Sequence, residues 1–319
     1  MNVIDQKIEE NYSIYNADTI EVAQALPSDS VDFSIFSPPF ASLYTYSNSD
    51  RDMGNVKSHD EFWEHYKYLV KEQFRVMKSG RNIAIHCMNL PTSKQRDGFI
   101  GLSDFRGDMI RAYQEAGFIY HSEVCIWKCP VVAMTRTKAL GLLHKTIKKD
   151  SAMSRQGIPD YVVVMRKLGE NQNPIAGEFQ YYVGETPPKG FTTHERDDGS
   201  IFAKPAEDNT SIDVWQKYAS PIWDDIRQTD TLNFREGRDS DDERHICPLQ
   251  LQVIERCLQL WSLPNDLVWT PFMGIGSEVY MSLKLGRKAI GVELKPSYYQ
   301  LAERNIKKAS ENQYDLFAA

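Results

Sequence analysis

The chain has 319 residues, of which 41% are hydrophobic and 25% are charged, and its formal net charge is -7. This composition is ordinary for a globular protein and excludes a fibrous or intrinsically disordered chain. The length allows one large α/β domain with an insert, or two modest domains. The negative balance excludes a bulk basic footprint for nucleic acid, although basic segments can still be segregated along the chain.

The start of the chain and the cysteines indicate where the protein works. The first ten residues are polar and charged, and no apolar run is long enough to span a bilayer. We therefore expect a cytoplasmic protein with no membrane partner. The five cysteines are an odd number without a Cys-x-x-Cys pair. They predict reduced, mostly buried thiols and no bound metal.

Two parts of the chain alternate short apolar strands with amphipathic helices, as in an α/β sheet. In the first part we predict strands over 31–36, 83–87 and 118–127 and helices over 58–78 and 104–116. Near the C-terminus we predict helices over 248–260, 277–285 and 296–309 and strands over 267–270 and 289–292. The interval 128–243 between them has no clear pattern and begins with a basic segment. Long insertions of this kind are usually functional or partly mobile.

A glycine turn follows the strand predicted over 267–270. Gly274 and Gly276 allow a sharp turn and a close backbone approach to a ligand, and a helix begins near Ser277. At the end of the next strand, Glu293 is placed to accept hydrogen bonds from ribose hydroxyls. The third glycine of the dinucleotide fingerprint is absent, which favours an adenosine ligand without phosphates, such as S-adenosylmethionine. A plain tight turn beside a surface glutamate is the alternative.

A stiff corner follows the strand predicted over 31–36. The residues Ser37, Pro38, Pro39 and Phe40 end the strand and hold polar groups at a fixed angle. The Ser37 side chain and the Pro38 carbonyl can accept hydrogen bonds from an amino group, while Phe40 can stack on the base that carries it. Such acceptors would orient an exocyclic amine for attack on a sulfonium methyl group. A proline turn with a core phenylalanine is the alternative.

The order of these two motifs resembles the DNA amino-methyltransferases, the N4-cytosine and N6-adenine methylases. That family has a catalytic Asp/Ser/Asn-Pro-Pro-aromatic motif and a Phe-x-Gly-x-Gly cofactor loop. The catalytic motif comes first in the circularly permuted β group, and the pattern is similar to phage and prophage methylases in particular. The resemblance implies a Rossmann-like α/β methyltransferase fold with a mostly parallel seven-stranded sheet. It also implies that strands 31–36 and 267–270 are neighbours.

The resemblance further implies a division of the chain and a set of roles. Residues 1–127 would form the catalytic half, 128–243 a target-recognition insert and 244–319 the cofactor-binding half. Asp18 would lie near the cofactor's adenine. The segment before the cofactor loop departs from the family pattern, because it lacks the lysine that the family has there. The residues implied to bind S-adenosylmethionine are Asp18, His245, Ile246, Cys247, Pro271, Phe272, Met273, Gly274, Gly276, Ser277 and Glu293.

The partner implied is double-stranded DNA, with the target base leaving the duplex. Basic residues early in the insert are placed to follow the phosphate backbone, or alternatively to form a solvated charged face. They are Arg136, Lys138, Lys145, Lys148, Lys149 and Arg155. In the family, serine at the first motif position goes mostly with cytosine N4, so we expect cytosine ahead of adenine N6.

Other functions remain open at this point. They are an RNA or protein amine methyltransferase, a nucleotide-binding oxidoreductase and a catalytically silent DNA-binding module. A zinc deaminase is excluded because its His-x-Glu and Pro-Cys-x-x-Cys motifs are absent. The assembly is open as well, with a homodimer as one alternative.

Overall fold

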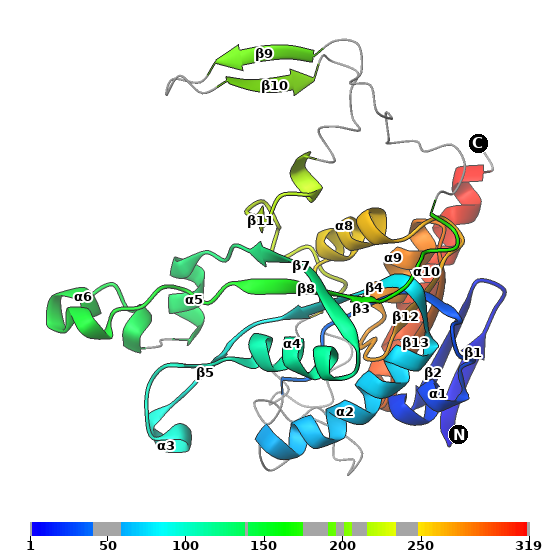
Figure 1. Cartoon of the computed structure of the whole chain (residues 1–319), viewed down its shortest axis with the longest axis horizontal. Helices are drawn as coiled ribbons and strands as arrows, with labels where there is room; N and C mark the ends of the chain where they lie inside the picture. The colour runs from blue at the N-terminus through cyan, green and yellow to red at the C-terminus, as the bar shows by residue number, and fades with distance from the viewer. Residues whose placement is uncertain are drawn as a thin grey trace.

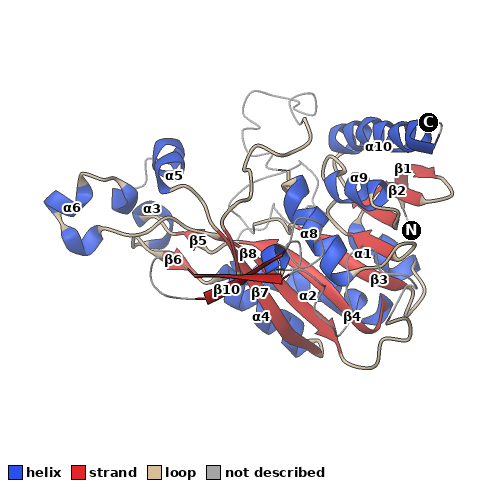
Figure 2. Ribbon diagram, turned by 90° about the horizontal axis from the view of Figure 1, so that it is seen from above, coloured by secondary structure: helices blue, strands red, loops and turns tan. Residues whose placement is uncertain are grey.

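The computed structural model describes residues 2–40, 59–137, 140–174, 191–195, 201–205, 216–233 and 248–317. Figures 1 and 2 show a central twisted sheet with helices packed against both of its faces. Nine strands of the described chain form this sheet, in the order β1-β2-β13-β12-β3-β4-β8-β7-β11. Two further pairs, β9 with β10 and β5 with β6, form separate small sheets.

The strands have the following bounds: β1 Val3–Ile8, β2 Tyr12–Ala17, β3 Val31–Phe36, β4 Met77–Cys87, β5 Leu90–Pro91, β6 Leu102–Ser103, β7 Phe118–Ile126, β8 Asp160–Lys167, β9 Phe191–Glu195, β10 Ile201–Pro205, β11 Ile222–Trp223, β12 Leu267–Thr270 and β13 Lys288–Glu293. The helices are α1 Thr19–Ala25, α2 His59–Val76, α3 Lys94–Asp97, α4 Phe105–Glu115, α5 Pro130–Thr137, α6 Thr146–Lys149, α8 Leu251–Trp261, α9 Ser277–Lys284 and α10 Pro296–Phe317.

Strand direction decides where the site lies. The five strands β2, β13, β12, β3 and β4 are parallel to one another. β8 is antiparallel to both of its neighbours, β4 and β7. β7 therefore runs in the same direction as β4. As a result, the carboxyl ends of six strands and the first residue of β8 lie along one edge, where ligands of open α/β sheets bind.

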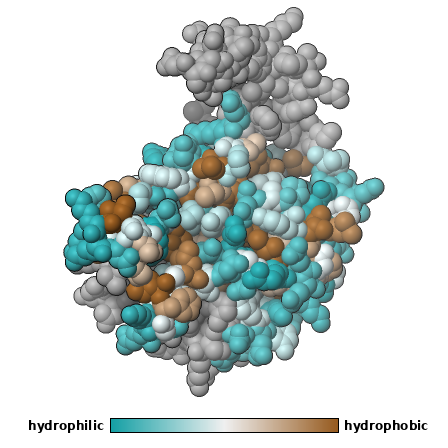
Figure 3. All heavy atoms as spheres, turned by 60° about the vertical axis from the view of Figure 1, so that its left-hand side comes forward, coloured by the Kyte–Doolittle hydropathy of each residue, from teal (hydrophilic) through white to brown (hydrophobic). Residues whose placement is uncertain are grey.

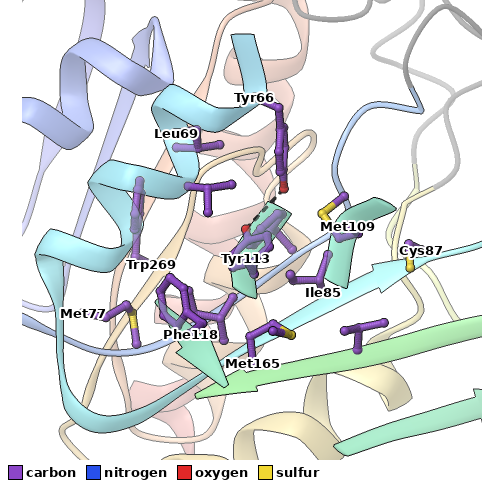
Figure 4. Packing of buried hydrophobic residues seen from close by; sticks show 14 of the residues in the cluster. Tyr66, Leu69, Met77, Ile85, Cys87, Met109, Tyr113, Phe118, Met165 and Trp269 are labelled. Carbon is purple, nitrogen blue, oxygen red and sulfur yellow. Dashed lines mark hydrogen bonds between the residues drawn. The ribbon is translucent and has the colours of Figure 1, made fainter. Parts of the chain in front are cut away.

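Two helical layers bury the sheet. Helices α2 and α4 contribute Tyr66 and Tyr113 to a core cluster that also includes Trp269 of β12. Figure 4 shows the side chains of Tyr66 and Tyr113 pointing toward each other, with their hydroxyls 3.3 Å apart. Helix α8 and part of α9 pack on the opposite face, through Ile254 and Met281. All six residues of β3 are buried, as expected for a central parallel strand covered on both faces.

Most predicted elements are confirmed. The strands predicted over 31–36 and 267–270 agree with β3 and β12 at both ends. The helix predicted over 58–78 is α2, and its apolar side chains Phe62, Leu69 and Val70 are at most 1% exposed. Beyond the seven expected strands, the sheet carries β1 and the two-residue β11 at its edges.

The interval 128–243 is not irregular throughout, and this part of the prediction was wrong. It contains β8, which lies inside the sheet between β4 and β7. The run from Val162 to Val164 is a strand signal of β-branched residues, but charged residues on both sides of it obscured the pattern. The division of the chain at residues 127 and 243 stays a prediction. Among the described helices, none is long and apolar enough to cross a membrane.

Candidate active site

The two sequence motifs meet at the carboxyl edge of the sheet. β3 and β12 are parallel neighbours, with Phe33 opposite Val268 and Ser34 opposite Trp269. The Ser34 hydroxyl donates a hydrogen bond of 2.7 Å to the Trp269 carbonyl. Just beyond this pairing, the rings of Phe36 and Phe272 lie 5.8 Å apart between centroids. The adjacency predicted for these strands is therefore confirmed, and the corner at 37–40 faces the turn at 271–277.

The two glycines of the turn have different structural roles. Gly274 has φ +50°, and a Cβ added there would meet no other described atom within 4 Å. Gly276 has φ +88°, and an added Cβ would lie 3.1 Å from the Ala302 Cβ and 3.2 Å from the Ile306 Cδ1 of α10. Gly274 thus borders open space into which a ligand can approach the backbone, whereas Gly276 allows close packing of the turn against α10.

Polar groups without partners lie next to this turn. Thr270 is 1% exposed and Ser277 is 2% exposed, and neither side-chain hydroxyl has a hydrogen-bond partner among the described residues. Buried polar groups are normally paired. These two hydroxyls therefore indicate that a polar ligand completes the site at the glycine turn.

Acidic residues follow the next two strands. Glu293 ends β13, and its Oε1 accepts a hydrogen bond of 2.8 Å from the Lys295 backbone amide. Asp18 follows β2, and its Oδ1 accepts from the amides of Ile20 and Glu21 at 2.8 and 3.1 Å. β2 pairs with β13 so that Asn16 lies opposite Glu293. Both carboxylates therefore lie at the edge predicted for the cofactor, although one oxygen of Asp18 is used to cap α1.

A buried acid missed by sequence reasoning lies in the first turn of α9. Glu278 is 4% exposed. Its pKa is raised to about 8, mainly by burial, with a smaller lowering by its own backbone amide and a smaller raising by the neighbouring Glu293 carboxylate. The side chain is therefore largely neutral at neutral pH and adds no full negative charge beside Glu293.

The corner at 37–40 combines rigidity with partial exposure. Pro38 is buried, while Ser37, Pro39 and Phe40 remain partly exposed. The Phe40 ring packs edge-on against Phe105 of α4, with 6.0 Å between ring centroids. One part of the Phe40 ring is thus held by the core, and the remainder faces the site edge.

The Ser37 hydroxyl reaches a histidine on the neighbouring strand. Its Oγ lies 3.3 Å from His86 Nδ1 and also 3.3 Å from the His86 carbonyl. His86 Nε2 lies 3.2 Å from Asp160 Oδ2, and Lys128 Nζ lies 2.5 Å from Asp160 Oδ1. Asp160 is 3% exposed. Burial raises its pKa, but His86 and Lys128 outweigh this effect and hold the pKa below its ordinary value.

The fold and the motifs place the chain in a family. The sequence model of the N6/N4 DNA methylases, described as "DNA methylase", matches residues 31–304, which is most of the chain. The protein belongs to this DNA methylase family. Over 291 residues it is 24% identical to the type II methyltransferase M.BglII of Bacillus subtilis. That match covers 91% of this chain and 67% of M.BglII.

Solved structures confirm the methyltransferase fold of this methylase. TTHA0409 of Thermus thermophilus, described as a DNA modification methylase and solved with S-adenosyl-L-methionine, superimposes with a TM-score of 0.63 at 19% identity over 92% of both chains. The PvuII DNA methyltransferase, described as cytosine-N4-specific, superimposes with a TM-score of 0.56 at 15% identity. That superposition covers 97% of this chain and 94% of the PvuII enzyme.

The basic segment of the methylase forms an arm between β7 and β8. We call the segment 130–157 the arm; it contains α5 and α6 and extends away from the sheet in Figures 1 and 2. Lys145, Lys148 and Lys149 are exposed on it. Arg155 is half-buried, and its backbone amide bonds to the Gly141 carbonyl at 2.8 Å, which closes the arm.

The surface of the arm is not uniformly basic. Its exposed apolar side chains include Val131, which is 62% exposed, and Ile147, which is 58% exposed. Figure 3, which brings this side forward, shows hydrophobic and hydrophilic residues next to one another. The role of the arm in DNA binding stays a prediction.

The structure thus brings two sets of predicted residues to one edge. They are the corner 37–40 and, on the cofactor side, Asp18, Pro271, Phe272, Met273, Gly274, Gly276, Ser277 and Glu293. His245, Ile246, Cys247 and Lys138 lie outside the described residues, and the Arg136 side chain is not among those described. His86 and Asp160 were not predicted, because each is an ordinary residue at the end of a strand whose neighbours are distant in sequence.

Proposed function

We propose that this DNA methylase transfers a methyl group from S-adenosylmethionine to the N4 amino group of a cytosine flipped out of duplex DNA. The observation that carries the proposal is the pairing of β3 with β12. This pairing brings the Ser37 hydroxyl and the open side of Gly274 to the same edge of the sheet. The methylation of adenine N6 is the alternative, because the family includes both reactions.

The residues at the glycine turn fit an adenosine cofactor. Gly274 leaves room for close approach, and the unpaired hydroxyls of Thr270 and Ser277 provide polar contacts. Glu293, at the end of the following strand, suits a ribose diol. When bound, S-adenosylmethionine supplies an electrophilic methyl group. The complex of TTHA0409 with the same molecule supports this assignment.

The corner at 37–40 then prepares the amine. The lone pair of an exocyclic amino group is conjugated into the base, so the nitrogen is a poor nucleophile. Ser37 Oγ and the Pro38 carbonyl accept its hydrogens and hold the nitrogen in line with the methyl group, which is catalysis by orientation and fixed dipoles. The exposed part of Phe40 provides a surface on which the flipped base can stack.

Serine at position 37 favours cytosine over adenine. In the family, aspartate at this position goes mostly with adenine and serine mostly with cytosine. The PvuII enzyme, which shares the fold, is described as cytosine-N4-specific. A methyltransferase acting on RNA or protein amines is the further alternative, and the membership in the DNA methylase family stands against it.

One assay tests the reaction and the base together. The wild-type protein is incubated with methyl-labelled S-adenosylmethionine and unmethylated plasmid DNA, and the DNA is digested to nucleosides for mass spectrometry. We expect N4-methylcytosine. If N6-methyladenine is found instead, the target base is adenine and not cytosine. If the label appears only in tRNA or protein offered in parallel, the substrate is not DNA.

Variants of the corner locate the chemistry. We expect Phe40→Ala to lower methyl transfer at least tenfold while S-adenosylmethionine affinity, measured by calorimetry, stays within about twofold. Tyr68→Ala is the matched control, since Tyr68 is an aromatic residue of α2 that is 64% exposed on the surface. If Phe40→Ala and Tyr68→Ala transferred methyl groups equally well, base stacking on Phe40 would be wrong.

A further inference from the structure

We propose that His86, oriented by Asp160 and Lys128, takes up the proton that the target amine releases, with the Ser37 hydroxyl carrying it between them. This proposal rests on the proposed function and adds three residues to the same site. A chain of polar side chains crosses the carboxyl edge of the sheet. In it, Ser37 Oγ lies 3.3 Å from His86 Nδ1, and His86 Nε2 lies 3.2 Å from Asp160 Oδ2.

Four elements build this chain. Ser37 follows β3, His86 is near the end of β4, Asp160 begins β8, and Lys128 follows β7. The antiparallel direction of β8 is essential, because it brings the first residue of β8 to the edge where its neighbours end. Asp160 lies opposite Ile126 of β7, which brings Lys128 Nζ to 2.5 Å from its carboxylate.

The charges decide which ring nitrogen of His86 carries the proton. Asp160 is paired through Oδ1 with the Lys128 ammonium group, 2.5 Å away, and this cation favours the ionised carboxylate. His86 Nε2 lies at ion-pair distance from Asp160 Oδ2, 3.2 Å, without making a well-aligned hydrogen bond in this structure. Because a carboxylate only accepts hydrogen bonds, we assign a proton to Nε2, the nitrogen next to Asp160. Nδ1 is then an acceptor for the Ser37 hydroxyl hydrogen, at the same 3.3 Å from Oγ as the His86 carbonyl, which accepts it in the alternative rotamer of the hydroxyl. With that hydrogen turned inward, the lone pairs of Ser37 Oγ face the site and can accept hydrogens from an amine.

Ser37 needs such a partner because it is neutral. A carboxylate at this position would take a proton by itself, whereas a hydroxyl that receives one must pass its own proton on. As the amine nitrogen bonds to the methyl carbon, the bond from that carbon to sulfur would break with its electron pair left on sulfur, and the nitrogen would gain a positive charge. It returns to neutrality when one N–H proton moves to Ser37 Oγ and the hydroxyl proton moves to His86 Nδ1. The imidazolium formed is stabilised by Asp160, and its proton later leaves to water.

The surrounding charges do not compete for His86. The charged side chains near this end of β4, β7 and β8 include Arg106 and Glu123, which pair at 2.8 Å, and Asp104, whose charge acts on the neighbouring Cys87. Arg106 also lies over the Tyr161 ring, 4.6 Å from its centroid. The neighbouring Cys87 is buried, and burial raises its pKa well above the ordinary value, so it is neutral.

A double-mutant cycle tests the relay through activity. General bases contribute roughly 10²–10⁴-fold to catalysis, so we expect His86→Asn to lower kcat by about 10²-fold with little change in KM. In a Ser37→Ala background, His86→Asn should have no further effect, because its partner is gone. His121→Asn, on the exposed part of β7, should match the wild type. Additive losses from Ser37→Ala and His86→Asn would overturn the proposal.

The cofactor affinity of each variant, measured by calorimetry, should stay near the wild-type value and shows that the variants are folded.

A measurement without catalysis separates the relay from the proposed function. In protein with ¹⁵N-labelled histidine, the His86 signals at neutral pH should be those of a neutral ring protonated at Nε2. Asp160→Asn, or Lys128→Met if the former does not fold, should shift the ring toward the other tautomer. A ring protonated at Nδ1 or at both nitrogens in the wild type would overturn the relay, whatever base the enzyme methylates. If the His86 ring has the expected tautomer but the enzyme methylates no DNA, the proposed function is refuted instead.

Discussion

Replacing Gly276 by alanine should destabilise the fold far more than the same change at Gly274. Both residues have positive φ, at +88° and +50°, and left-handed backbone costs a non-glycine residue roughly 1–2 kcal/mol. Only the new Cβ at position 276 meets neighbours, at 3.1 Å from the Ala302 Cβ and 3.2 Å from the Ile306 Cδ1. Overpacking of this kind costs roughly 1–3 kcal/mol.

The expected loss in the free energy of unfolding is therefore about 2–5 kcal/mol for Gly276→Ala and about 1–2 kcal/mol for Gly274→Ala. Urea unfolding followed by circular dichroism measures both, provided that the m-values stay equal. Calorimetry with S-adenosylmethionine should give the opposite ranking: Gly274→Ala weakens cofactor binding more than Gly276→Ala, because its Cβ points into the open side of the turn.

A third variant isolates the contact with α10. In an Ala302→Gly background the nearest Cβ is gone, while the Ile306 Cδ1 at 3.2 Å and the Cα of residue 302 at 3.3 Å remain, so Gly276→Ala should cost less there than in the wild-type background. Equal unfolding free energies for Gly276→Ala and Gly274→Ala, with no coupling to position 302, would refute the reasoning. The turn would then not be packed against α10 as described.

Three other predictions address charge. Glu278→Gln should flatten the pH dependence of stability. The pKa of Glu278 in the folded state, about 8, lies above its ordinary value of 4.5, so between these two pH values the folded state binds more protons than the unfolded state. In the wild type, the free energy of unfolding therefore falls by at most about 5 kcal/mol as pH rises through this window. Arg81→Leu should cost roughly 3–5 kcal/mol in the free energy of unfolding, because it removes the cation that lies 3.0 Å from the buried Asp266 and 3.3 Å from the buried Asp32, which keeps only Lys78. Alanine at the three exposed lysines of the arm should reduce the slope of log affinity for DNA against log salt by about 0.9 for each phosphate that the arm no longer neutralises. These lysines are Lys145, Lys148 and Lys149.

Matched controls make these three outcomes decisive. Glu255→Gln makes the same change of residue type on the partly exposed side of α8 and serves as the control for Glu278→Gln. Arg81→Lys keeps the charge and should lose less stability than Arg81→Leu. Alanine at Lys67 and Lys71 of α2 should leave the salt slope unchanged, since α2 lies away from the arm (Figure 1). A salt slope unaffected by the arm lysines would mean that they form a solvated face.

The sequence by itself determined the elements and the nature of the two motifs. β3 and β12 are recognisable from short apolar runs, and the corner at 37–40 and the turn at 271–277 from prolines and glycines. These signals are local, because they depend on which backbone angles a few consecutive residues can adopt. Their order along the chain, compared with the family, then predicted that the two strands are neighbours.

Only the tertiary structure decided which residues surround Ser37. His86 and Asp160 come from strands of opposite direction, and their approach depends on the position of β8 between β4 and β7. A shift of β8 by one residue would turn Asp160 to the other face of the sheet. Strand order and register are set by the packing of the whole sheet against its helices, so no pattern within either segment of the sequence contains them.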